Sequence, residues 1–454
     1  MKKAVSVLCV ILLLFLIGVV AIAAPSSGEF GENLFWSVDD NGTLTVSGEG
    51  PMPATDQYPW KNVSNVKAAV IGNGVTTIGA RAFWELASLK SVTIADTVES
   101  VGIYAFYNCR SLETVSFGKG LKTISSHAFR GCESLREALF QEGLVSIENH
   151  AFFQCGGLER VSFPSSLESL GIHSFEGCEA LKEVKIPERI QSVPQYAFYG
   201  CKALETVELP ARLTAIEANA FRECESLKIV NFPEGLKKIE DHAFMDCVLL
   251  EVADLPDSLT ELGGYAFYNC RMLKKIDIPG SAGKVEPFAF YNCYSATEIS
   301  IGEGITEIDK GAFRNCSKVE QADIPVSAKA IRDGAFYGCL AVTKVNYDGS
   351  QEQWSGIAIE PNNDPLLSAK INQVKKEYYQ LGDVNTDGKI NSVDARYLLR
   401  ISAKLENATE LQGKLGDINE DGKINSIDAR LALRISARLI SAPEKQIEEI
   451  LPAV

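Results

Sequence analysis

Phenylalanine recurs at intervals of 23 residues along more than half of the chain, without one insertion or deletion. The series begins at Phe83, ends at Phe336 and comprises twelve residues. A fixed period of about 20 to 50 residues is typical of solenoids, in which each repeat buries its apolar face only against its neighbours. The pattern therefore predicts a stack of twelve similar coils over residues 66–347.

Each repeat combines two apolar patterns. Ala105, Phe106, Cys109 and Leu112 follow one another at a spacing that predicts a short helical or 3₁₀ turn. Apolar and polar residues then alternate as far as Phe117, which predicts a strand, and Pro or Gly often follows as a turn. With one strand in each coil, we expect a long parallel sheet along the stack.

Cysteine occupies one position of the repeat, three residues after the phenylalanine, in eleven coils from Cys109 to Cys339. Neighbouring members of this column would lie about 5 Å apart, a distance that a disulfide can span. Their number is odd, however, and Leu86 holds the same position in the first repeat, which marks it as a core position. We expect reduced, structural cysteines that pack as small apolar residues, with disulfides as the alternative.

The first residues predict an export signal. Lys2 and Lys3 precede an apolar stretch over residues 5–20, and Ala21-Ile22-Ala23 has the small residues of a cleavage site. We expect residues 1–23 to be a signal peptide and the protein to be secreted. A retained membrane anchor is the alternative.

The segments that flank the repeats predict caps for the two open ends of the stack. In residues 24–65, the strands 34–38 and 43–46 surround the turn Asp40-Asn41-Gly42, which predicts a β-hairpin. Residues 348–371, with Trp354 and an apolar Leu pair, predict the C-terminal cap, and residues 372–380 a short linker.

Charge and motifs narrow the possible functions. The chain has 44 Lys and Arg against 59 Asp and Glu, a net charge of −15, so it lacks the basic footprint of nucleic-acid or membrane binding. The sequence contains no nucleophile motif and no phosphate-binding glycine loop, and coils of equal length offer no cleft for an acid and a base. We therefore predict no catalytic residues and no enzyme activity.

Two columns of rings are candidate binding surfaces on the array. The position two residues before each phenylalanine contains all four histidines of the chain: Arg81, Tyr104, His127, His150, His173, Tyr196, Asn219, His242, Tyr265, Phe288, Gly311 and Gly334. The position after the phenylalanine is aromatic in seven coils: Trp84, Tyr107, Phe153, Tyr199, Tyr268, Tyr291 and Tyr337. Consecutive histidines could bind a transition metal, and the rings could offer an aromatic strip to sugars or peptides. The favoured alternatives are a stacked structural ladder and packing at the surface.

A second repeat follows the array. Residues 382–405 and 416–439 are identical at 18 of 24 positions, and each begins with oxygen-bearing side chains at alternate positions around a glycine. This is the pattern of a calcium loop, since hard oxygen ligands suit Ca²⁺ better than zinc. The predicted ligands of the first ion are Asp383, Asn385, Asp387, Lys389, Asn391 and Asp394. Those of the second ion are Asp417, Asn419, Asp421, Lys423, Asn425 and Asp428.

Both loops depart from the usual EF-hand. Asp stands at the twelfth loop position in place of Glu, and Tyr378-Tyr379-Gln380-Leu381 leads directly into the first loop without a helix. A loop followed by a single helix, present twice within residues 381–440, resembles a type I dockerin. The resemblance implies docking onto a cohesin module of a scaffoldin in a cellulosome, the extracellular complex that degrades plant cell walls.

The dockerin resemblance also implies which residues face the cohesin. Carried over to this sequence, they are Ser392, Val393, Leu399, Arg400 and Lys404 in the first half, and Ser426, Ile427, Leu433, Arg434 and Arg438 in the second half. Packing in the dockerin core is the alternative for the apolar members. We expect Ile390, Leu398 and Ile401 to be core residues, whereas Leu399 fits either position.

The 23-residue unit, Ala-Phe-x-x-Cys-x-x-Leu-x-x-Val-x-Ile-Pro, resembles the BspA-like leucine-rich repeat of bacterial surface and secreted proteins. The two resemblances imply an α/β solenoid of leucine-rich repeats, then a small all-α calcium-binding dockerin and a C-terminal tail over residues 441–454. They imply a secreted, non-catalytic cellulosome component whose repeats bind a protein or a cell-wall or cell-surface ligand. A tethered enzyme or regulator of polysaccharide breakdown, or a rigid spacer, is the alternative.

Overall fold

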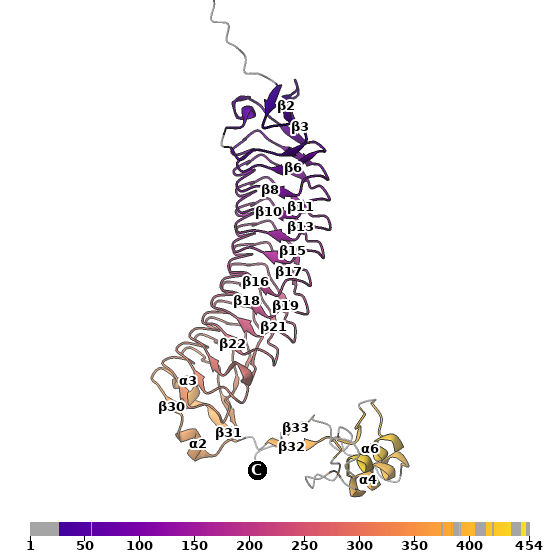
Figure 1. The fold of residues 1–454 in the computed structure, drawn as a ribbon. Helices are drawn as coiled ribbons and strands as arrows, with labels where there is room; N and C mark the ends of the chain where they lie inside the picture. The colour runs from indigo at the N-terminus through magenta and orange to yellow at the C-terminus, as the bar shows by residue number, and fades with distance from the viewer. Residues whose placement is uncertain are drawn as a thin grey trace, which may run out of the picture.

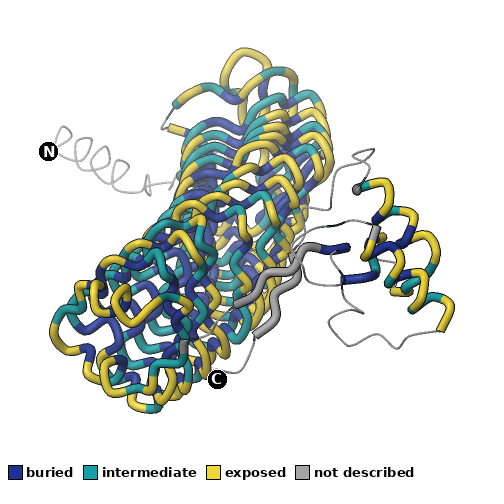
Figure 2. Tube along the Cα trace, turned by 90° about the horizontal axis from the view of Figure 1, so that it is seen from below, coloured by how far each residue is buried: buried dark blue, intermediate teal, exposed yellow. Residues whose placement is uncertain are grey.

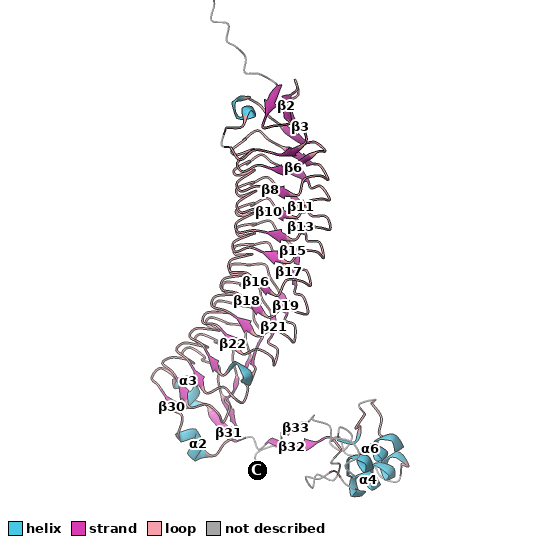
Figure 3. Cartoon of the chain, viewed as in Figure 1, coloured by secondary structure: helices cyan, strands magenta, loops and turns pink. Residues whose placement is uncertain are grey.

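The repeat array is an elongated, gently curved stack of short coils (Figure 1). The structure, a computed structural model, describes residues 27–55, 57–373, 376–382, 384, 390, 392–404, 415–419, 422–436 and 446–450. The predicted signal peptide therefore lies outside the described residues. Most of each coil consists of turns, and the strands within it are short (Figure 3). The architecture predicted from the period of 23 is confirmed.

Two ladders of parallel strands run along the array, where one strand in each coil was expected. The first ladder contains β5 (Ala68–Ile71), β7 (Ser91–Ile94), β9 (Thr114–Ser116), β11 (Glu137–Leu139), β13 (Arg160–Ser162), β15 (Glu183–Lys185), β17 (Thr206–Glu208), β19 (Ile229–Asn231), β21 (Val252–Asp254), β23 (Lys275–Ile278), β25 (Glu298–Ile301), β27 (Gln321–Asp323) and β29 (Lys344–Tyr347). The second, narrower ladder contains β6 (Val75–Ile78), β8 (Ser100–Val101), β10 (Thr123–Ile124), β12 (Ser146–Ile147), β14 (Ser169–Leu170), β16 (Ser192–Val193), β18 (Ala215–Ile216), β20 (Lys238–Ile239), β22 (Glu261–Leu262), β24 (Lys284–Val285), β26 (Glu307–Ile308) and β28 (Ala330–Ile331). Strands of two residues are too short to produce the alternation that reveals a strand in a sequence.

The segment around each phenylalanine is a chain of tight turns, so the expected helical or 3₁₀ turn is wrong for the array. Tyr104 and Asn108, on either side of Phe106, have φ values of 57° and 54°. A right-handed helix excludes this left-handed backbone. In this segment every second amide N–H points along the stack. Phe106 N, for example, donates to Ala128 O of the next coil at 2.7 Å. Hydrogen bonds therefore join the coils here as well as in the ladders.

The core is a column of phenylalanine rings that runs through the stack. Neighbouring rings lie with centroids 4.8 to 5.8 Å apart and, as at Phe152 and Phe175, nearly parallel. Figure 2 shows the buried residues on the inner side of every coil. The eleven cysteines of the array are free and buried beside this column, as expected. Each Sγ donates to the carbonyl oxygen of the preceding coil's phenylalanine, for example from Cys109 to Phe83 at 3.0 Å.

The N-terminal cap imitates the coil that would precede the first repeat. It consists of β1 (Ser27–Phe30), β2 (Leu34–Val38), β3 (Thr43–Gly48), β4 (Gly50–Pro51) and the 3₁₀ turn η1 (Pro59–Asn62). Strands β2 and β3 pair as the expected antiparallel hairpin, and β3 joins the first ladder beside β5. The ring of Trp60 stacks on Phe83 at 5.7 Å, and its Nε1 donates to Ala82 O at 2.7 Å. Ala82 O thus receives the hydrogen bond that a preceding phenylalanine amide would otherwise supply.

The C-terminal cap covers the open end of the last coil. It supplies a hydrogen-bond acceptor, whereas the N-terminal cap supplies a donor. It contains α2 (Gln351–Ser355), β30 (Ala358–Ile359), α3 (Asp364–Ser368) and β31 (Lys370–Gln373). Phe336 N has no further coil to bind, and it donates instead to Asn363 Oδ1 at 2.9 Å. Asn363 is buried, and its Nδ2 donates to Arg332 O at 2.9 Å and Glu360 O at 2.8 Å. All polar groups of this buried side chain are therefore satisfied.

In the C-terminal module, helices α4 (Ser392–Ser402) and α6 (Ser426–Ser436) pack against each other. Leu398 is buried in their core, and Ile390 and Ile401 pack against it, as expected. Strand β32 (Lys376–Gln380) pairs with β33 (Gln446–Ile450) in an antiparallel manner. The segments predicted as a linker and a tail thus include one strand each. The sequence does not reveal these strands, because a short alternating stretch gives no strand signal unless its partner is known.

Candidate functional site

Two buried carboxylates hold the calcium-loop segments against helices α4 and α6. Asp394 and Asp428, the last ligands of the predicted loops, are fully buried. Asp394 Oδ1 accepts a hydrogen bond from Val384 N, and Asp428 Oδ1 accepts one from Ile418 N, both at 2.9 Å. The two halves therefore have the same construction. A buried carboxylate is costly unless it binds donors or a cation, so these two residues fit a cation site.

The described part of the second loop has the backbone of a calcium loop. Gly422, at the sixth position, has φ +79°, which favours glycine, and its N donates to Asp417 Oδ2 at 2.7 Å. Asn425 N donates to Asp428 Oδ2 at 2.9 Å, and Asn425 Oδ1 accepts from Ile427 N at 2.8 Å. The carboxylate and amide oxygens match the ligands that Ca²⁺ prefers.

Several predicted ligands lie outside the described residues: Asp383, Asn385, Asp387, Lys389, Asn391 and Asp421. Asn419 and Lys423 are described and lie exposed at the second loop. Among the residues that the structure describes, no three His, Cys, Asp or Glu side chains form a cluster that could hold a metal ion. The ligand sets therefore stay predictions.

Apolar residues expected to face a cohesin lie exposed on both helices. Val393 and Leu399 on α4 are 43% and 47% exposed, and their counterparts Ile427 and Leu433 on α6 are both 45% exposed. Basic residues accompany them: Arg400 and Arg434 are exposed on the helices, and Lys404 follows α4. Ser392 begins α4, Ser426 begins α6, and Arg438 lies outside the described residues. Exposed Leu399 has no place in the dockerin core, which leaves it available for a partner.

The first column of rings is a stacked ladder. The rings of Tyr104, His127, His150, His173 and Tyr196 follow one another with centroids 4.5 to 4.6 Å apart and interplanar angles of 11° to 20°. The lone pair of an imidazole nitrogen lies in the ring plane, so those of nearly parallel rings do not converge on one point. The geometry favours the structural ladder over the metal site that the histidine spacing suggested.

Burial gives the histidine ladder an unusual acid–base character. Desolvation, together with His173, His127 and Arg130, lowers the pKa of His150 to about 4. Desolvation also lowers the pKa of His127, with a contribution from Arg130. His173 Nδ1 forms a short contact with Glu176 Oε2. Within the ladder, His127 and His150 therefore favour the neutral imidazole.

The second column contains arginines among its aromatic rings. Arg130 lies 4.4 Å from the ring centroid of Phe153, and Arg314 lies 4.4 Å from that of Tyr337. The rings of Tyr268 and Tyr291 stack on each other at 4.7 Å. Neighbouring rings and guanidinium groups therefore cover many ring faces, which favours packing over the open row of flat faces expected for a sugar- or peptide-binding strip.

The chain is a solenoid of bacterial leucine-rich-repeat type that carries a module of two loop–helix units. The family model described as "BspA type Leucine rich repeat region (6 copies)" matches residues 55–171, 145–253 and 237–361, more than half of the chain, and the chain belongs to this family. The model "Dockerin type I domain" matches residues 381–434, so the second module is a type I dockerin.

The array is similar to solved bacterial leucine-rich-repeat structures. A protein from Bacteroides ovatus is 24% identical, with 76% of this chain and 99% of that chain covered and a TM-score of 0.49. One from Eubacterium ventriosum is 20% identical, with 69% and 94% covered and a TM-score of 0.45. A cell surface protein from Faecalibacterium prausnitzii is 27% identical, with 74% and 98% covered and a TM-score of 0.34. Among curated proteins, none matches this chain.

The family assignment fixes the coarse function. A type I dockerin implies docking onto a cohesin in a cellulosome, and leucine-rich repeats imply a protein ligand. Both are non-catalytic types of module, and type I dockerins generally bind calcium. In the part of the chain that the structure describes, no helix has the length and apolar character needed to cross a membrane.

Proposed function

We propose that this protein is a secreted, non-catalytic cellulosome component. Its dockerin binds two Ca²⁺ ions and docks onto a scaffoldin cohesin, and its repeats hold a further ligand at the complex, most simply a protein. The observation that carries the proposal is the pair of matched apolar and basic surfaces on α4 and α6, each beside a buried loop aspartate.

Calcium has a structural role in this proposal. The ligands are Asp383, Asn385, Asp387, Lys389, Asn391 and Asp394 in one loop and Asp417, Asn419, Asp421, Lys423, Asn425 and Asp428 in the other. A bound ion neutralises the loop carboxylates and fixes the start of the following helix. A module with so small a core needs such a staple, since metal binding supplies folding free energy.

Calcium removal from the full secreted chain tests the proposal. We expect a chelator to abolish binding to recombinant cohesins and to release hydrogen-exchange protection in α4 and α6, while the coils of the array stay protected. Asp394→Ala combined with Asp428→Ala should act like the chelator. The matched control is Asp254→Ala with Asp257→Ala, two exposed carboxylates of the array, which should leave docking unchanged.

Two results would contradict the proposal. Protection of α4 and α6 that is independent of calcium would remove the metal from the folding of the dockerin. Release of reducing sugar from plant cell wall by the purified chain would show that the protein is catalytic.

A further inference from the structure

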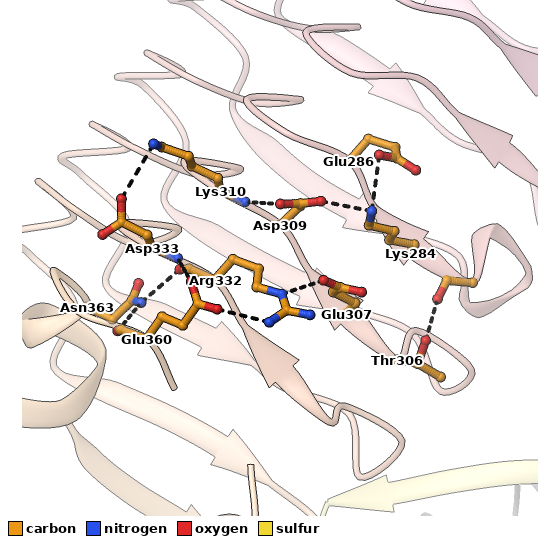
Figure 4. A network of polar contacts seen from close by, with 11 residues as sticks. Lys284, Glu286, Thr306, Glu307, Asp309, Lys310, Arg332, Asp333, Glu360 and Asn363 are labelled. Carbon is orange, nitrogen blue, oxygen red and sulfur yellow. Dashed lines mark hydrogen bonds and ion pairs between the residues drawn. The ribbon is translucent and has the colours of Figure 1, made fainter. Parts of the chain in front are cut away.

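The face of the second ladder is filled in the C-terminal half of the array. Strands β20, β22, β24 and β26 begin there with long charged side chains, Lys238, Glu261, Lys284 and Glu307. Lys238 pairs with Glu261 at 2.7 Å across neighbouring coils. Lys284 pairs with Asp309 at 2.8 Å, and Glu307 pairs with Arg332 at 2.5 Å, within the network of Figure 4.

The same face is hollow in the N-terminal half. The equivalent positions hold small residues: Ser100, Thr123, Ser146, Ser169, Ser192 and Ala215. Two adjoining hollows of about 710 Å³ and 430 Å³ lie over these coils, and Ser169, Leu170, Ser192 and Pro194 line both of them. Together they form one depression that extends over several coils. Its lining contains no aromatic side chain.

Two residues explain why the depression lies here. Gly171 and Pro194 occupy the repeat position at which Glu148 and Glu217 project their carboxylates. Glu217 N donates to Val193 O at 3.0 Å, but Pro194 has no N–H to offer to Leu170 O. The second ladder is accordingly interrupted between β14 and β16, which end two separate sheets. The sequence therefore both empties the surface and breaks the ladder at the same coils.

The depression carries a pattern of fixed charges. Glu148 Oε2 accepts from Ser126 N and Oγ at 2.9 Å, and Glu217 accepts from Ser192 Oγ at 2.9 Å and Gln195 N at 3.1 Å. Neither carboxylate forms an ion pair within the described part of the chain. Their hydrogen bonds hold both groups in place without neutralising them.

The rim adds two arginines in neighbouring turns. Arg189 and Arg212 replace the Gly or Ser found at this turn position in coils on both sides, such as Ser166 and Gly235. Arg189 pairs with Glu168 at 2.5 Å, whereas Arg212 is exposed and makes no ion pair in the described residues. With Glu188 included, the lining has four carboxylates against two guanidinium groups, so it is net negative.

We propose that this depression is the docking site for an extended segment of a partner protein that carries basic side chains. The proposal deepens the proposed function of the repeats and rests on it. Glu148 and Glu217 are three coils apart, about 14 Å at the spacing of parallel strands. Two residues four positions apart in an extended peptide span about 13 Å, so a Lys or Arg at each can meet both carboxylates. The net negative lining disfavours acidic polysaccharides, and the absence of rings disfavours stacking of neutral sugars.

Peptide pools test the site in the full secreted chain. The probes are labelled dodecapeptide pools of random sequence with Lys fixed at two positions separated by two to six residues, and matched pools with Gln or Glu there. Fluorescence anisotropy should show binding of the Lys pools, strongest near a spacing of four. Glu148→Gln with Glu217→Gln removes both charges, keeps a carbonyl oxygen for the backbone N–H of Ser126 and of Gln195, and should weaken this binding by about fivefold, as expected for two exposed charge pairs.

A second variant fills the depression with side chains that the scaffold accepts elsewhere. Ser169 and Ser192 are equivalent to Lys238 and Glu261, so Ser169→Lys with Ser192→Glu should form the same inter-coil ion pair and abolish peptide binding. The control, Lys238→Ser with Glu261→Ser, should bind peptide like the parent.

Three results would overturn the proposal: no binding of any Lys pool, binding that survives in the filled variant, or competition by neutral cell-wall oligosaccharides for the same site. Binding that survives filling would leave the repeats as a protein-binding array with its site elsewhere. Docking to cohesin is measured separately and does not depend on this outcome.

Discussion

The thiols of Cys109 and Cys155 lie in the core of the array, where burial raises the pKa of both to about 12. The thiolate is the reactive species in alkylation and disulfide exchange. Each thiol also donates to a phenylalanine carbonyl of the preceding coil, which ties it to the fold. Folding therefore conceals the cysteine column from oxidants.

This reasoning predicts the response to an alkylating reagent. With iodoacetamide at mildly alkaline pH, the folded chain should acquire no adduct on the eleven cysteines of the array, as measured by mass spectrometry. After unfolding in guanidinium chloride the same sample should acquire eleven. Fewer adducts on the unfolded chain, with a mass deficit that reduction restores, would reveal disulfides instead.

Two single side chains close the ends of the hydrogen-bond ladder. Trp60→Phe keeps the ring on Phe83 but leaves Ala82 O without its donor, and Asn363→Ala leaves Phe336 N without its acceptor. Each should cost about 1–3 kcal/mol, the penalty for a buried unsatisfied polar group. In a solenoid the loss should be greatest at the affected end.

Hydrogen exchange resolved by peptide checks this prediction. Protection should fall in the first coil for Trp60→Phe and in the last coil for Asn363→Ala. Trp84→Phe, in the half-buried surface column, and Gln351→Ala, exposed in the first turn of α2, are the matched controls and should change little. Uniform loss of protection along the array would contradict a role in end capping.

At the scale of elements, the sequence predicts the features that recur in each repeat. It does not predict the elements that depend on contacts with neighbouring coils. The period of 23, the Phe and Cys columns and the hairpin cap follow from residues that recur or alternate. The second ladder does not, because its strands of two residues carry no periodicity. The turns around Phe106 look helical in the sequence, since spacing does not reveal the left-handed backbone at Tyr104 and Asn108.

Candidate sites divide in the same way. The calcium loops are visible because their ligands are close together in the sequence. The depression over Ser169 and Ser192 was missed, because it arises where four coils lack the large side chains of other coils, and no motif marks it. A signal was present in the turns: Arg189 and Arg212 interrupt a column of small residues in adjacent repeats.

The histidine ladder makes the stability of the array depend on pH. The pKa of His150 is about 4 in the fold, below the value of about 6.5 for an unperturbed histidine. The unfolded chain therefore binds the proton first as the pH falls, so the contribution of His150 to stability is present above pH 6.5 and is lost between about pH 6.5 and 4. His127 and His242, whose pKa values are also lowered by desolvation, act in the same direction.

Substitution by a ring that does not titrate isolates this effect. His150→Tyr continues the ladder with the residue found at Tyr104 and Tyr196. The melting temperature of the variant should fall less than that of the parent between pH 6.5 and 4, while the two respond alike above pH 7. Parallel pH profiles would show that carboxylates alone govern the acid response.

At the scale of the whole molecule, α4 and α6 of the dockerin carry nearly identical sets of exposed residues. Leu399 with Arg400 on α4 corresponds to Leu433 with Arg434 on α6, and exposure of the two leucines differs by only a few per cent. If either surface can face one cohesin, the complex has two equivalent orientations. The array would then leave the scaffoldin in either of two directions, which widens the reach of its ligand site.

Single-half and double-half variants distinguish one orientation from two. Leu399→Ala with Arg400→Ala removes one surface and should weaken cohesin binding only about twofold, because one of two equivalent orientations is lost. Leu433→Ala with Arg434→Ala should have the same effect. All four substitutions together should abolish binding measured by calorimetry in the presence of Ca²⁺. These side chains are exposed, so the helices should stay folded in every variant, as circular dichroism can verify. A large loss in only one of the single-half variants would show that the cohesin reads one surface alone.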